Sequence, residues 1–76
     1  MTWKVKNPFM LDRHELNLMA SVANMYPERH ATDVAERINQ TAAASFVAMA
    51  DDDHADVIHV YDEDSRLYAK IEREEV

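Results

Sequence analysis

The acidic run Asp51-Asp52-Asp53-His54-Ala55-Asp56 is the part of the sequence where chemistry is most naturally sought. Clustered carboxylate oxygens are the ligands that Ca²⁺ and Mg²⁺ prefer. The twelfth residue counted from Asp52 is an acid, Glu63, as in a calcium loop, but Val57 occupies the sixth position, where a glycine is expected to make the sharp turn. The run is therefore interpreted as a solvated acidic loop and no metal ligand is assigned. A metal-dependent enzyme or metal sensor using Asp51–Asp56 is the weaker alternative.

The histidines and serines do not form a catalytic pattern. No two of the four histidines have the i, i+4 spacing of a helical metal site, and no serine has the glycine-flanked turn that exposes a nucleophile. A domain of 76 residues also rarely encloses a large active-site pocket. We therefore expect a protein that is not an enzyme, with no catalytic residue and no cofactor.

Composition excludes several other functions. The chain has no glycine, so it lacks the backbone freedom on which phosphate loops and dinucleotide fingerprints depend, and it has no cysteine for disulfides or thiolate chemistry. Its formal net charge is −7 and it has no basic cluster, which argues against direct nucleic-acid binding. No stretch has the length of a signal or membrane-spanning segment, so no membrane association is expected and a cytoplasmic location is the default.

Charge is divided unevenly along the chain. Residues 1–50 hold five acids and five bases, whereas residues 51–76 hold ten acids and three bases and so carry the whole net charge of −7. A one-sided concentration of charge opposes folding, which makes it more suggestive of a function than dispersed charge. The ten acids are predicted to form a partner-binding acidic edge: Asp51, Asp52, Asp53, Asp56, Asp62, Glu63, Asp64, Glu72, Glu74 and Glu75.

The natural partner of such an edge is a basic protein surface, and many basic surfaces exist to hold nucleic acid. A folded acidic edge can compete for such a surface as a DNA mimic. In size and acidity the chain resembles the small phage-encoded inhibitors of host defence or transcription, including anti-CRISPR proteins. The resemblance implies an inhibitor of a nucleic-acid-handling protein. The alternative is a self-associating structural or scaffold protein whose acids only keep it soluble.

Hydrophobic periodicity predicts the N-terminal elements. Residues 2–6 alternate as a half-buried strand, and helical stripes predict a helix from about residue 13 and a longer one over residues 32–50. Both helices have apolar arcs wider than one core stripe needs, which predicts a surface for a partner or a homodimer. The residues that widen these arcs are Leu18, Val22 and Met25 on the first helix and Ala43, Val47 and Ala50 on the second, and the predicted contact surface is Val22, Met25, Ala43, Val47 and Ala50.

The C-terminal third is predicted to form a hairpin. Residues 57–61 and 67–71 alternate on either side of the turn-like residues 62–65, although the helix-forming side chains of 65–76 also allow a helix there. Pairing Tyr61 with Arg66 sets His59 opposite Tyr68 and gathers five apolar residues on one face: Ile58, Val60, Leu67, Ala69 and Ile71. The prediction is one α+β domain over residues 1–76, in the order β-α-α-β-β, with two helices packed on a three-stranded antiparallel sheet.

Overall fold

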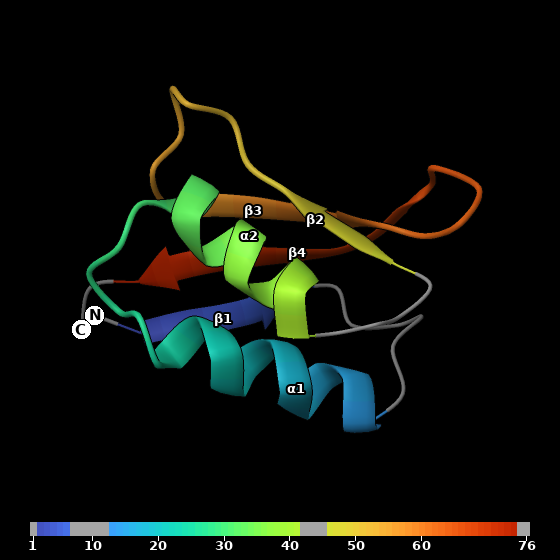
Figure 1. Cartoon of the computed structure of the whole chain (residues 1–76), viewed down its shortest axis with the longest axis horizontal. Helices are drawn as coiled ribbons and strands as arrows, with labels where there is room; N and C mark the ends of the chain where they lie inside the picture. Colours follow the sequence, from blue (N-terminus) through green and yellow to red (C-terminus); the bar gives the residue numbers. More distant parts are fainter. Residues whose placement is uncertain (1, 7–12, 42–45, 75–76) are drawn as a thin grey trace.

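The computed structural model describes residues 2–6, 13–41 and 46–74, with all of their side chains except that of Tyr68. In these ranges the chain forms a four-stranded antiparallel sheet in the order β1-β4-β3-β2, with both helices on one of its faces (Figure 1). The predicted α+β class is confirmed, with one strand more than expected. The elements are β1 Thr2–Lys6, α1 Arg13–Asn24, α2 Ala31–Thr41, β2 Val47–Met49, β3 Val57–Tyr61 and β4 Leu67–Glu74.

Strand β1 and helix α1 lie where the sequence predicted them. Trp3 is 1% exposed and faces the helices, while Lys4 faces away from them, as the alternation of β1 requires. Helix α1 begins at Arg13 and buries Met19, Val22 and Ala23 against the core.

The predicted long helix over residues 32–50 is wrong, because α2 ends at Thr41 and a strand follows it. From Phe46 the burial alternates with a period of two, since Phe46 and Ala48 are buried whereas Val47 and Met49 are more than half exposed. Pairing with β3 explains the difference: it gives the backbone of residues 47–49 a hydrogen-bonding partner and buries Ala48. This tertiary pairing outweighs the local helix propensity of an alanine-rich segment.

The C-terminal hairpin is confirmed, and β4 extends it to Glu74, which excludes the helical alternative over residues 67–74. The predicted register is wrong by two residues over most of its length, because His59 faces Lys70 rather than Tyr68. At the turn, Tyr61 pairs with Leu67, and an irregularity in the ladder follows Val60.

The turn itself explains this register. The Asp62 carboxylate accepts hydrogen bonds from the backbone N–H groups of Asp64 and Arg66, both at 2.9 Å, which closes the turn over residues 62–66. Ser65 takes a left-handed conformation with φ 62°. The ladder irregularity turns Leu67 onto the same face as Tyr61, so Leu67 is 57% exposed instead of joining the core as predicted.

The sheet therefore has two different faces. The inner face packs on the helices and contributes Trp3, Ala48, Ile58, Val60, Ala69 and Ile71 to the core. We call the opposite side, which neither helix covers in Figure 1, the outer face. Over β1 and β4 the outer face carries lysines and glutamates, and over β2 and β3 it carries mainly apolar and aromatic residues.

Two asparagines cover backbone groups on the two edge strands. Asn24 of α1 accepts from the N–H of Trp3 at 2.9 Å and donates to its carbonyl at 3.1 Å. Asn39 of α2 accepts from the N–H of Ala48 and donates to its carbonyl, both at 2.8 Å. Each side-chain amide thus takes the place that a further strand would occupy at that residue.

Candidate functional site

The acids predicted to bind a partner fall into two groups, and the first is neutralised within the fold. Asp56 pairs with Arg73, Glu72 pairs with Lys70 at 2.9 Å, and Glu74 pairs with both Lys4 and Lys6. Glu75 lies outside the described residues. These three acids thus face four basic side chains of β1 and β4 and add no net negative charge to the surface.

The pair between Glu74 and Lys6 joins the first and last strands. Hydrogen bonding to the Lys6 ammonium, with its charge, holds the pKa of Glu74 below its ordinary value of 4.5. The same hydrogen bond raises the pKa of Lys6 above its ordinary value of 10.5. Both side chains are exposed, so water screens the interaction.

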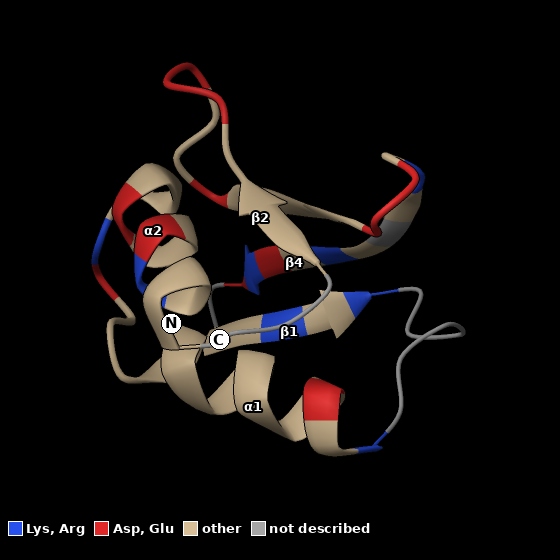
Figure 2. Ribbon diagram, turned by 45° about the vertical axis from the view of Figure 1, so that its right-hand side comes forward, with Lys and Arg blue, Asp and Glu red and all other residues tan. Residues whose placement is uncertain are grey.

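The second group of acids lies on two segments that project from the sheet. Asp51, Asp52 and Asp53 belong to the loop between β2 and β3, here called the 50–56 loop, and Asp62, Glu63 and Asp64 belong to the turn between β3 and β4, here called the 62–66 turn. Figure 2 shows the acidic residues of both segments in red, on loops that extend away from the body of the protein. Strand β3 separates them by its five residues, about 17 Å.

Four of these projecting acids are fully available to a partner. Asp52, Asp53, Glu63 and Asp64 are exposed, and within the described part of the chain none of their carboxylates forms an ion pair with a lysine or arginine. Asp51 is also exposed, with a carboxylate oxygen 3.5 Å from His54 Nδ1. Among the described residues, the excess of acids over bases is therefore concentrated on two segments at opposite ends of β3, rather than along one continuous edge.

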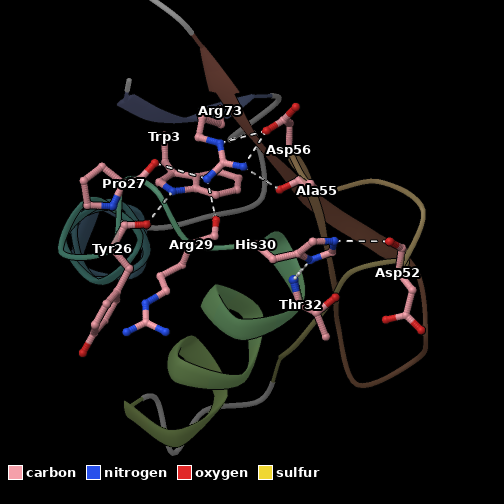
Figure 3. A network of polar contacts seen from close by, with 10 residues as sticks. All are labelled: Trp3, Tyr26, Pro27, Arg29, His30, Thr32, Asp52, Ala55, Asp56 and Arg73. Carbon is pink, nitrogen blue, oxygen red and sulfur yellow. Dashed lines mark hydrogen bonds and ion pairs between the residues drawn. The ribbon is translucent and has the colours of Figure 1, made fainter.

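The 50–56 loop is held at its base by the start of α2. The N–H of Ala31 donates to the carbonyl of Ala55 at 2.9 Å, and His30 bridges the two segments (Figure 3). His30 Nδ1 accepts from the N–H of Thr32 at 3.1 Å, so Nε2 carries the proton and donates to the carbonyl of Asp52 at 3.2 Å. His30 thus takes the N-cap position of α2, and it fixes the backbone that carries the acids.

Arg73 holds the other side of this loop, and the sequence did not identify it as important. Its side chain is 9% exposed and lies at the inner face, with the guanidinium carbon 4.7 Å from the centre of the Trp3 ring. It donates to the carbonyls of Pro27, Arg29 and Ala55 and to the carboxylate of Asp56 (Figure 3). One signal was available, because Arg73 continues the inward-facing alternation of residues 69 and 71.

The residues predicted to widen the helical arcs do not form one surface. Val22 is 6% exposed and belongs to the core, and Ala50 packs against the core. Met25 and Val47 are 68% and 51% exposed, but Met25 directly follows α1 and Val47 lies on β2 rather than on a helix. Ala43 lies outside the described residues.

An exposed hydrophobic patch is instead found on the outer face, over β2, β3 and the first residue of β4. We call it the apolar patch and define it as Val47, Met49, Tyr61 and Leu67. Three of these side chains are more than half exposed, and Tyr61 lies half-buried among them. A hollow of about 340 Å³ opens here, lined by Val47, Met49, Tyr61, Asp62 and Ser65. A second hollow of about 210 Å³, lined by Met49, Ala50, Asp51, His59 and Tyr61, adjoins it.

Other kinds of site are not found in the described ranges. Among residues 2–6, 13–41 and 46–74, no three histidine or carboxylate side chains are grouped so that they could hold a metal ion. Neither described helix is long and apolar enough to cross a membrane. The fold and surface define a small α+β protein with two projecting acidic segments. Comparison of the chain with protein-family models, curated proteins and solved structures gave no match.

Proposed function

We propose that this protein is a non-enzymatic inhibitor that occupies a basic, nucleic-acid-binding surface of a partner protein. The observation that carries the proposal is the presence of exposed carboxylates without a basic partner on both the 50–56 loop and the 62–66 turn. The other described acids of residues 51–74, Asp56, Glu72 and Glu74, are paired with lysine or arginine, so in this part of the chain the unpaired carboxylates lie on these two segments.

The way these segments are built supports a binding role. Like charges held close together repel one another and oppose folding. Here the backbone that carries the acids is nevertheless held in place. His30 and Arg73 bind carbonyls of the 50–56 loop, and the Asp62 carboxylate closes the 62–66 turn. Carboxylates on a fixed backbone lose little conformational freedom when they bind, which favours affinity for a surface of complementary charge.

Resemblance in size and acidity extends the proposal to the type of inhibitor. A DNA mimic, like the phage-encoded inhibitors of host defence or transcription and the anti-CRISPR proteins among them, offers carboxylates where nucleic acid offers phosphates. In this proposal the protein acts in the cytoplasm, binds no nucleic acid itself and has a basic nucleic-acid-handling protein as its partner.

Self-association is a second candidate, in which the acids only confer solubility. The exposure of Val47 and Met25 favours it, because large apolar side chains at the surface of a small domain often mark a contact. A homodimer that forms at micromolar concentration in sedimentation and is lost in Val47→Glu would support this candidate.

The inhibitor proposal is tested by capture followed by competition. The tagged protein is used to capture partners from nuclease-treated lysate of the cells that the protein acts in, and duplex DNA is then added. We expect the captured protein to be released by DNA, because both ligands occupy the same basic surface. Raising the salt concentration should also weaken the complex through screening.

Charge-matched variants make the test specific. Asp52→Asn with Asp53→Asn removes two acids from the 50–56 loop, and Glu63→Gln with Asp64→Asn removes two from the 62–66 turn. Each pair should weaken binding by about tenfold while leaving the fold intact. The control pair Glu28→Gln with Glu36→Gln removes the same charge from exposed positions elsewhere. Equal binding by all three variants, or a partner that DNA does not displace, would refute the proposal.

A further inference from the structure

The apolar patch lies directly between the two acidic segments. Val47 pairs with Tyr61 at the end of β3 that enters the 62–66 turn, and Met49 pairs with His59 two residues closer to the 50–56 loop. The larger hollow includes Asp62 in its lining and the smaller one includes Asp51. The patch is therefore a hydrophobic hollow with a carboxylate at each end.

Charge complementarity decides what kind of molecule fits this surface. A second copy of the chain would bring its own Asp51 and Asp62 against a surface that already carries these charges at both ends. The lysines on the other half of the outer face are Lys4, Lys6 and Lys70, and each is paired with a glutamate of its own chain. A second copy is thus disfavoured, whereas a segment with basic residues on both sides of an apolar one is complementary.

The edge of the sheet at β2 limits how such a segment can bind. Addition of a strand to β2 would need the outward-facing N–H and carbonyl of Ala48, and Asn39 already binds both. The occupant therefore lies across the outer face and is recognised through its side chains.

We propose that the hollow receives an apolar side chain of the partner, and that lysine or arginine residues on either side of it reach Asp51 and Asp62. This inference rests on the proposed function and specifies the partner's contact segment. Asp51 lies four residues beyond Val47, and Val47 pairs with Tyr61, which directly precedes Asp62, so a stretch of extended chain of about 15 Å separates the positions of the two acids. An extended segment matches this spacing when its basic residues are about four positions apart with the apolar residue midway, because alternate side chains point to the same side.

Synthetic peptides provide a defined probe. The first is an acetylated and amidated peptide containing Lys-Ser-Leu-Ser-Lys, and the second has serine in place of the leucine. Binding is followed by titration into isotope-labelled protein, recording amide chemical shifts. We expect the leucine peptide to bind about tenfold more tightly, because one leucine is buried. The largest shift changes should occur at Val47, Met49 and Tyr61.

A matched pair of variants tests the hollow itself. Met49→Ser removes an exposed methionine of the patch and should abolish the preference for leucine, whereas Met25→Ser removes a still more exposed methionine elsewhere and should preserve it. Equal binding of the two peptides, or shift changes that map away from the patch, would overturn the inference. Concentration-dependent changes of the same amides without peptide would overturn it too, by showing that a second copy is the occupant.

The outcomes also separate this inference from the proposed function. If both peptides bind equally and the acid-to-amide pairs on the two segments weaken them equally, the acidic surface is used but the hollow is not, and only the present inference fails. If neither peptide binds at millimolar concentration, this inference again fails, while the release of the captured partner by DNA still decides the inhibitor proposal independently.

Discussion

Arg73 shows how a single residue can position a surface that it does not form. Its guanidinium joins the loop between α1 and α2, through the carbonyls of Pro27 and Arg29, to the 50–56 loop, through the carbonyl of Ala55. A planar group with five N–H donors can satisfy several carbonyls at once, which a lysine ammonium cannot do in the same geometry. Burial against Trp3 makes these hydrogen bonds costly to lose.

Replacing this arginine by lysine should therefore destabilise the protein. We expect Arg73→Lys to lower the free energy of unfolding by about 2 kcal/mol, because several backbone carbonyls lose their donor while the positive charge is kept. Chemical denaturation measures the change, and Arg66→Lys, at an exposed position, is the control with an expected change below about 0.5 kcal/mol. A change for Arg73→Lys as small as that of the control would contradict the role described.

The sequence could not have predicted these contacts in full. Alternation along residues 69–73 places Arg73 on the inner face, yet two of its acceptors are backbone carbonyls about 45 residues earlier in the chain. Carbonyls have no signature in a sequence, and the same holds for the contact of His30 with the carbonyl of Asp52. The acids themselves, by contrast, are visible in the composition, which is why the two projecting segments were among the predicted site residues.

At the scale of elements, the predictions succeed where a pattern is local and fail where it depends on a distant partner. Strand β1, helix α1 and the hairpin each show their period within one segment. Strand β2 has only three residues, and its pairing with β3 decides its conformation. The apolar patch was missed for the same reason, because assigning Val47 and Met49 to a helix removed them from the sheet face that they share with Tyr61.

The two asparagines give the helices a role beyond covering the core. A short edge strand exposes unpaired backbone groups that invite another chain to pair with it. Asn39 reaches from α2 to bind both backbone groups of Ala48, and Asn24 does the same from α1 for Trp3. Each helix thus protects one edge of the sheet at the residue where its side-chain amide binds.

We expect Asn39→Ala to open the β2 edge. Loss of two hydrogen bonds should lower the free energy of unfolding by about 1–2 kcal/mol, and the amide of Ala48 should exchange with solvent hydrogen much faster. Sedimentation should also detect increased self-association through the freed edge. Asn17→Ala, at an exposed position of α1, is the control. Unchanged protection of the Ala48 amide in Asn39→Ala would show that the asparagine does not cover this edge.

At the scale of the whole molecule, the fold pairs some acids with lysine or arginine and leaves others unpaired on the projecting segments. The sequence predicts that the last 26 residues carry all of the net charge, and this follows from composition alone. It does not reveal that β4 lies beside β1, where Lys4 and Lys6 neutralise Glu74. The long-range pairing of the first and last strands therefore decides which acids remain free for a partner and which become part of the structure.

This pairing predicts a specific dependence of stability on pH. Because the pKa of Glu74 in the folded protein lies below its ordinary value of 4.5, the unfolded chain takes up the proton first as the pH falls. The stability that the carboxylate contributes is complete above 4.5 and is lost as the pH falls through the lower, folded-state value. The difference in free energy of unfolding between wild type and Glu74→Gln should therefore be largest near neutral pH and shrink in acid.

Taking this difference cancels the protonation of the other acids, which occurs in both proteins. Repeating the comparison in a Lys6→Met background should reduce the effect, since the Lys6 hydrogen bond is the main cause of the lowered pKa. A difference that stays constant from neutral pH into acid would show that Glu74 does not tie the two terminal strands together through its charge.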